Sequence, residues 1–206
     1  LITVNELLDM FDSDTIRFYF SFKGPESSDI NCSIDDIIMT HNKFLVGMLG
    51  NFVNRNLSFI NKKFDGKISI GDIDNVIKES TIKTYKIIGE YIEKGEIKAA
   101  VTQIIEYVSL ANKYYDGREP WKQVKDDING FNDTTYTCLY MMANIANMIA
   151  PILPKASKKI KNMLGFEKLK WSEEVPNGEY EIKNLDILYN RIDEFKNDDF
   201  QIERKK

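Results

Sequence analysis

The chain has 206 residues, and its hydrophobic content of 43% is enough for one large domain with a full core. Its net charge of −4 excludes a uniformly basic surface for nucleic acids. The one histidine excludes a zinc site built on histidines and a di-iron site built on two Glu-x-x-His motifs. We expect no metal in this chain, and the distant cysteines Cys32 and Cys138 favour a reducing, cytoplasmic setting.

The two ends of the chain carry few signals. No apolar run approaches the roughly 18 residues of a membrane span, so we expect no membrane partner. Asn5 and Glu6 interrupt the apolar residues at the start, which argues against a signal peptide. The first residue is Leu1 rather than Met, and we therefore expect a fragment of a longer protein.

The segment before residue 33 is expected to form two short helices and a loop. Asn5 is the expected cap of a helix over 6–11, and Ser13 of a second helix that ends near Phe22. The Gly-Pro pair and the serines that follow predict a loop over 23–32.

The longest expected element is one helix over 34–63. Ser33 and Asp36 have the spacing of a helix start, and no proline interrupts the segment, so the 29 residues 34–62 alone would span roughly 43 Å. Gly66 is expected to end it. Apolar residues at helical spacing predict one buried stripe, made of Ile37, Ile38, Phe44, Leu45, Met48, Leu49, Phe52 and Phe59. On a helical wheel Phe44, Met48, Phe52 and Phe59 lie at its centre.

Arg55 falls on this apolar stripe, and Asn51 lies at its edge one turn earlier. A guanidinium there is costly unless it is paired, so one interpretation is an internal salt bridge to an acidic residue of another helix. The other interpretation is that the stripe opens to solvent at this point, where Asn51 and Arg55 face a ligand. His41, near the same stripe, is expected to be a hydrogen-bonded core residue.

The remaining helices are marked by caps and breaks. Their expected ranges are 74–92, 96–115, 120–124, 133–149 and 154–164. Their expected starts are Asp72 or Asp74, Glu96, Pro120, Asp133 or Thr134, and Pro154, and their breaks are Lys94-Gly95, Asp116-Gly117, Pro151 and Gly165. The methionines of 133–149 are expected in the core. Short extended pieces around Trp171, Val175 and Tyr180 and a last helical turn or two over 185–195 complete an all-α bundle of four or five main helices.

Three features have chemical potential beyond packing. Asn51 and Arg55 lie one turn apart, Asn112 and Asp116 lie one turn apart, and Trp121 follows Pro120 at a polar corner. An indole that stacks on an unpaired base contributes about 1–3 kcal/mol. A bidentate arginine contact to a base edge contributes a similar amount, about 1–3 kcal/mol. The combination favours a reader of single-stranded bases.

Several segments resemble the methionyl-tRNA synthetase family, and together they cover most of the chain. The two main ones are residues 50–66, GNFVNRNLSFINKKFDG, and 112–121, NKYYDGREPW. Three shorter matches are 14–19, DTIRFY, 151–154, PILP, and, more loosely, 188–192, LYNRI. The resemblance implies the anticodon-binding helix bundle of class I aminoacyl-tRNA synthetases over 33–165. The residues before it, 1–32, would link to a catalytic domain, and 166–206 would form a tail.

The resemblance also implies roles. Asn51, Arg55 and Trp121 would read the anticodon of methionine tRNA, initiator and elongator, with Trp121 on the first base. Asn112 and Asp116 would shape the pocket from behind, and Pro120 would belong to the same anticodon-binding set. The sequence has no His-Ile-Gly-His-like motif and no Lys-Met-Ser-Lys-Ser loop, so ATP and methionine would bind the missing catalytic domain of the methionine–tRNA ligase. We expect no cofactor here and no methionine activation by this chain alone.

Two alternatives remain open from the residues. One is the equivalent bundle of the valine, isoleucine or cysteine enzyme. The other is a helical interaction module with no RNA role, in which Arg55 would pair with a buried acid and Trp121 would be covered on both faces.

Overall fold

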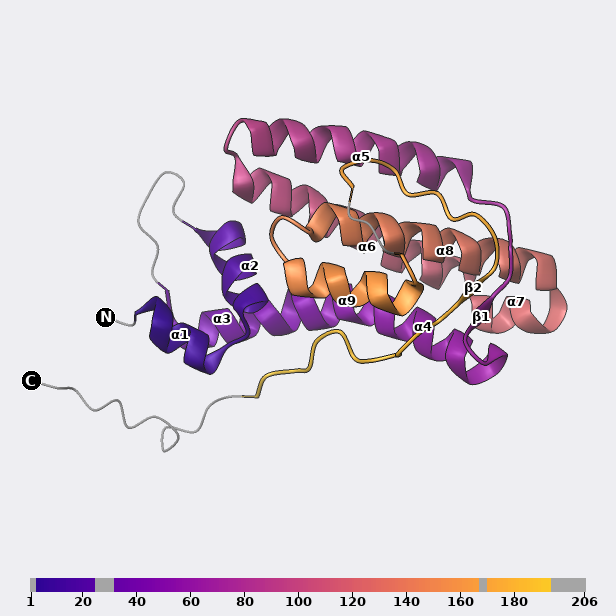
Figure 1. Cartoon of the computed structure of the whole chain (residues 1–206), viewed down its shortest axis with the longest axis horizontal. Coiled ribbons are helices and arrows are strands. Elements are labelled where there is room, and N and C mark those ends of the chain that lie inside the picture. The colour runs from indigo at the N-terminus through magenta and orange to yellow at the C-terminus, as the bar shows by residue number, and fades with distance from the viewer. Residues whose placement is uncertain (1–2, 25–31, 167–169, 194–206) are drawn as a thin grey trace, which may run out of the picture.

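A computed structural model describes residues 3–24, 32–166 and 170–193, and it is a helical bundle, as predicted (Figure 1). The helices are α1 (Val4–Met10), α2 (Ser13–Lys23), α3 (Ile34–Thr40), the π-helix η1 (His41–Gly50), α4 (Asn51–Phe64), α5 (Asn75–Glu93), α6 (Ile97–Arg118), α7 (Pro120–Asp126), α8 (Ile128–Ile149) and α9 (Pro154–Leu164). Two short strands, β1 (Lys67–Ile68) and β2 (Tyr180–Glu181), pair antiparallel. No helix among these is long and apolar enough to cross a membrane.

The predicted long helix runs from Ile34 to Phe64, but its middle is the π-helix η1 rather than α-helix. A π-helix bonds each N–H to the carbonyl five residues earlier, so its turn is wider than that of an α-helix. Within this turn the backbone at Gly50 lies close to the Leu45 carbonyl oxygen, and a Cβ at position 50 would lie 2.9 Å from that oxygen. Glycine avoids this contact because it has no Cβ. The helix ends as expected in left-handed residues, Asp65 and Gly66.

The wide turn changes which residues of this helix are buried. Leu45, Leu49, Leu57 and Ile60 are buried, whereas Phe44, Met48 and Phe59, predicted at the centre of the stripe, are only partly buried. The wheel assumed about 100° for each residue, and a π-helix advances less than that, so in this segment the buried stripe is centred on Leu45 and Leu49, two other members of the predicted stripe. Phe52 is buried as predicted.

Helix α8 lies at the centre of the bundle and packs against α5, α6, α7 and α9 (Figure 1). Its methionines, Met141, Met142 and Met148, are fully buried, which confirms that they belong to the core. A second, smaller core joins the helices that precede η1. Its buried members are Leu7, Phe11, Ile16, Tyr19, Ile37 and Ile38.

Some helix ends differ from the prediction because another cap is better placed. Thr3, not Asn5, caps α1, since Thr3 and Glu6 form a reciprocal capping box. Asp12, not Ser13, caps α2 and accepts the N–H of Asp14 at 2.9 Å. Helix α8 starts at Ile128, before the predicted Asp133 or Thr134, because the Asp127 carboxylate accepts the N–H of Gly130.

Helix α6 continues past the predicted stop at Asp116-Gly117 and ends at Arg118. Gly117 does not adopt a positive φ, and Glu119 takes the left-handed conformation instead, with φ 48°. A residue that precedes proline avoids the right-handed helical conformation, so Pro120 sets the position of this break. Pro120 then occupies the first turn of α7, as predicted.

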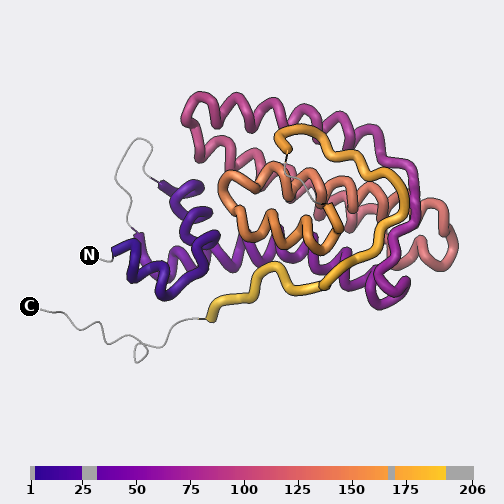
Figure 2. The backbone as a smooth tube through the Cα atoms, viewed as in Figure 1, coloured from indigo at the N-terminus to yellow at the C-terminus, as the bar shows by residue number. Residues whose placement is uncertain are grey.

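Residues 170–193 cross the bundle and return along the long helix, as the tube shows (Figure 2). The predicted helix over 185–195 is wrong for the described residues 185–193, and 194–195 lie outside the described residues. Side chains of the long helix bind this backbone instead. The Asn42 amide donates to the Ile192 carbonyl at 2.7 Å and accepts the Ile192 N–H at 2.9 Å. His41 Nε2 lies 2.9 Å from the Asn190 carbonyl, and His41 is buried, as predicted.

Candidate functional site

Two hydrogen-bonded pairs, one turn apart, join the start of α4 to the C-terminal half of α6. The Asn51 side-chain amide donates to the Asn112 side-chain oxygen at 3.0 Å. One turn further along both helices, Arg55 Nη2 donates to the Asp116 carboxylate at 2.6 Å. The sequence predicted Asn51 with Arg55 on one helix and Asn112 with Asp116 on another. The structure brings these two helix faces together through two bonds that each span 61 positions of the chain.

Asn112 is held by a full set of partners. Its amide nitrogen donates to the carbonyl oxygens of Met48, at 3.1 Å, and of Val108, at 3.0 Å. Since its oxygen also accepts from Asn51, it has a supporting position in the pair. Among the described residues the Asn51 side-chain oxygen has no partner, so Asn51 can still present an acceptor to a ligand.

Arg55 combines features of both interpretations of its position. It pairs with an acidic residue of another helix, as the first interpretation predicted, but the pair is open to solvent, with the side chains 37% and 56% exposed. The guanidinium carbon also lies 4.9 Å from the centre of the Tyr115 ring. Arg55 is therefore held in place on the surface, with room for a further contact.

Trp121 reaches the same surface from the first turn of α7. Its indole is 38% exposed and lies 5.8 Å from the Tyr115 ring, at an interplanar angle of 56°. Pro120 is buried directly before it and sets the helix break. If the chain were a helical interaction module with no RNA role, Arg55 would pair with a buried acid and Trp121 would be covered on both faces. Asp116 and Trp121 are exposed instead.

Tyr115 is the residue that sequence reasoning missed at this surface. It is only 4% exposed, and its ring contacts both Arg55 and Trp121. Burial raises the pKa of its hydroxyl to about 12, so it stays neutral. Its position three residues after Asn112 was the available signal, because residues at that spacing share a helix face.

The surface offers a partly exposed indole, a cation and an amide within one region. Such groups suit a flat heterocycle, which the indole stacks on and the polar groups bind at its edge. Among the described residues no group of three or more His, Cys, Asp or Glu side chains could hold a metal ion.

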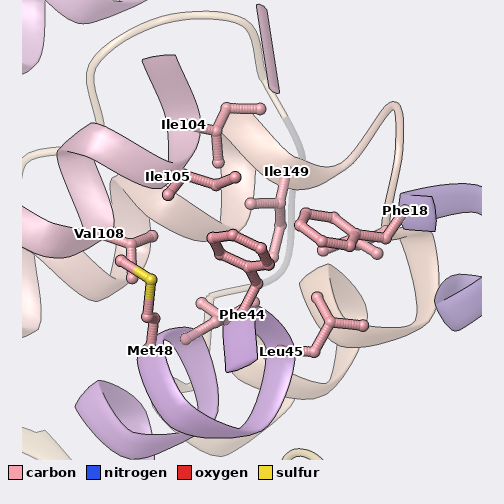
Figure 3. Close-up of a pocket in the computed structure, with 10 residues that line it drawn as sticks. Phe18, Phe44, Leu45, Met48, Ile104, Ile105, Val108 and Ile149 are labelled. Carbon is pink, nitrogen blue, oxygen red and sulfur yellow. The ribbon is translucent and has the colours of Figure 1, made fainter. Parts of the chain in front are cut away.

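Hollows lined by other residues also occur in the described part of the chain. An apolar cavity of about 20 Å³ lies between η1, α2, α6 and α8, with Phe44 and Met48 pointing into it (Figure 3). It has room for little more than one water molecule and no polar lining, so it is a packing gap. An open groove of about 590 Å³ lies where residues 188–192 pass the N-terminal ends of α2 and α9. In this groove Lys155 and Asp12 form an ion pair with each other, so both charges are already paired within the chain.

Comparisons with known proteins place the chain in a family. A family model described as the anticodon binding domain of methionyl tRNA ligase matches residues 67–202, and one described as tRNA synthetases class I (M) matches residues 1–57. The match over residues 1–57 includes Asn51 and Arg55. The match over residues 67–202 includes Asn112, Asp116, Pro120 and Trp121. The chain therefore belongs to the class I aminoacyl-tRNA synthetases and contains a helical anticodon-binding domain.

The relatives agree on the family. The chain is 38% identical over 194 residues to a methionine–tRNA ligase of Bacillus mycoides and to methionine–tRNA ligase 1 of Bacillus cereus, which covers 93% of the chain. The chain belongs to the methionyl-tRNA synthetase family, and the matching family is not that of the valine, isoleucine or cysteine enzyme. It spans about a third of the length of these relatives, 35% in each case.

A solved structure supports the fold. The apo form of Mycobacterium tuberculosis methionyl-tRNA synthetase matches 94% of this chain and 42% of its own, with a TM-score of 0.85 and 20% identity. The predicted fold class, the anticodon-binding helix bundle, is thereby confirmed.

Proposed function

We propose that this chain recognises the anticodon of methionine tRNA through the surface between α4, α6 and α7. The observation that carries the proposal is the convergence of Asn51, Arg55 and Trp121 on one solvent-open region, from segments far apart in sequence. The family match supports it, since the matching model describes an anticodon-binding domain.

Each residue has a separate role in this proposal. Trp121 stacks on the first anticodon base, and Asn51 and Arg55 bind the edges of the bases. Asn112 and Asp116 hold Asn51 and Arg55 from behind, and Pro120 sets the corner that carries Trp121. Stacking and edge contacts to unpaired bases need few phosphate contacts, which suits a chain of net charge −4.

The wider activity is proposed from the relatives. The complete protein would charge initiator and elongator methionine tRNA in the cytoplasm, with ATP and methionine bound by a catalytic domain outside this chain. This chain would supply the recognition of the anticodon and no cofactor site of its own.

The test is a binding titration of the 206-residue chain with an anticodon stem–loop RNA. The RNA carries the methionine anticodon, and a second RNA differs only in having a valine anticodon. We expect Arg55→Gln and Trp121→Ala to weaken binding of the methionine RNA by roughly 5- to 150-fold, equivalent to about 1–3 kcal/mol, and to leave the chain folded.

Trp171→Ala is the matched control. Trp171 is 43% exposed and packs edge-on against Tyr85 at 5.6 Å, a ring distance close to the 5.8 Å between Trp121 and Tyr115. It lies over α5, away from the proposed surface. It should bind the RNA like the unaltered chain. Equal losses in Trp121→Ala and Trp171→Ala, or binding that follows stability alone, would make both side chains structural and would contradict the proposal.

A further inference from the structure

Tyr115 lies between the two side chains that the proposed function uses most. The Arg55 guanidinium is 4.9 Å from the centre of its ring, and the Trp121 ring is 5.8 Å from it. Arg55 comes from α4 and Trp121 from α7, and one contact from each is made with this one ring of α6. The ring itself is buried, so it cannot read a base directly.

The backbone of Tyr115 contacts the same corner. Its carbonyl oxygen accepts the N–H of Glu119 at 3.2 Å. Glu119 is the left-handed residue that ends α6 and precedes Pro120, so this bond helps to define the direction in which α7 and its Trp121 leave the helix. One residue therefore touches Trp121 through its ring and supports the turn that carries Trp121 through its backbone.

Arg55 needs such support because its side chain is long and partly exposed. An arginine loses rotamer freedom when it binds a base, and that loss reduces affinity. Asp116 holds one end of the guanidinium, and the Tyr115 face holds it from below, which keeps the remaining N–H groups in one orientation before RNA arrives.

We infer that Tyr115 is a positioning residue of this surface, which sets the spacing and orientation of Arg55 and Trp121 and thereby contributes to discrimination between anticodons. This inference rests on the proposed function. It concerns the ring of Tyr115 rather than its hydroxyl, because the ring makes both contacts.

The test compares Tyr115→Leu with Tyr115→Phe in the 206-residue chain. The measured quantity is the ratio of the dissociation constants for the valine-anticodon and methionine-anticodon stem–loops. This ratio does not depend on the fraction of folded protein, so a loss of stability alone leaves it unchanged. We expect Tyr115→Leu to lower the ratio about 5-fold, the size of one cation–π contact, and Tyr115→Phe to keep it.

Tyr114→Leu is the control for the loss of a tyrosine from the same turn. Tyr114 faces Arg118, at 5.9 Å, and has no described ring contact with Arg55 or Trp121. It should leave the ratio unchanged. A double-mutant cycle gives a second readout, because Arg55→Gln should have a smaller effect in the Tyr115→Leu background than in the unaltered chain.

The outcomes separate the inference from the proposed function. If Arg55→Gln and Trp121→Ala weaken binding but Tyr115→Leu leaves the ratio unchanged, or if Tyr115→Phe behaves like Tyr115→Leu, the positioning role is refuted and the proposed function stands. If Arg55→Gln and Trp121→Ala are themselves without effect, the proposed function fails first.

Discussion

The π-helix η1 ends at Gly50, directly before Asn51 of the proposed surface, and its geometry predicts the effect of a substitution at Gly50. Gly50 immediately precedes Asn51, and a Cβ at this position would lie 2.9 Å from the Leu45 carbonyl oxygen. An ordinary helical Gly→Ala substitution stabilises by about 0.5–1 kcal/mol, because glycine loses more backbone freedom on folding. Here the contact is with backbone rather than with a flexible side chain, so relief must come from a shift of the helix itself, at a typical cost of about 1–3 kcal/mol.

We therefore expect Gly50→Ala to lower the free energy of unfolding by about 1–2 kcal/mol in urea titrations followed by circular dichroism. The control is Gly117→Ala, at a helical position where a Cβ would meet nothing within 4 Å. That variant should raise the free energy of unfolding by about 0.5–1 kcal/mol. Stabilisation of similar size in both variants would refute the close backbone contact at Gly50.

Three further predictions concern stability. Burial lowers the pKa of His41 below the ordinary 6.5, so the folded chain favours its neutral form. The contribution of His41 to the free energy of unfolding is therefore complete above about pH 6.5 and should fall on acidification, by up to about 1.4 kcal/mol per pH unit. His41→Gln should remove that part of the pH dependence in urea titrations from pH 7.5 to about pH 5. Leu139→Ala in the core of α8 should cost about 2–5 kcal/mol by the same method, and Val76→Ala, 74% exposed, less than about 0.5 kcal/mol; equal costs would contradict the assignment of the core. Asp116→Asn should cost under about 1 kcal/mol because its pair with Arg55 is solvent-open, and a loss of several kcal/mol would show that the pair is structural.

Much of the fold could be predicted from local signals in the sequence. Pro154 and Gly165 bound α9 as expected, Asp74 caps α5, and the methionines of α8 are buried. These features depend on the conformational limits of single residues or on a regular 3.6-residue repeat, which a sequence displays directly.

The predictions that failed concern residues whose structure depends on a partner distant in sequence or on a departure from the regular α-helix. The π-helix could not be read from a wheel that assumes α-helical spacing, so Leu57 and Ile60 were absent from the predicted stripe. Residues 185–193 were predicted helical, yet their backbone groups bind Asn42, His41 and Asn54, which lie more than 130 positions earlier.

The candidate site was predicted in part. The spacing of Asn51 with Arg55 and of Asn112 with Asp116 placed each pair on one helix face, and the resemblance joined them to Trp121 and Pro120. Spacing could not show that the two pairs bond across α4 and α6, nor that Tyr115 lies beneath Arg55 and Trp121, because both depend on how α4, α6 and α7 pack.

The fluorescence of Trp121 reports whether its indole stacks on an anticodon base. Trp171→Phe leaves Trp121 as the remaining tryptophan, and Trp121→Phe leaves Trp171, because the chain has two. We predict that the methionine-anticodon stem–loop quenches the emission of the Trp171→Phe chain saturably, that the valine-anticodon RNA does so only at higher concentration, and that neither quenches the Trp121→Phe chain. Binding of the methionine RNA with no change in Trp121 emission would show that Trp121 does not stack on a base.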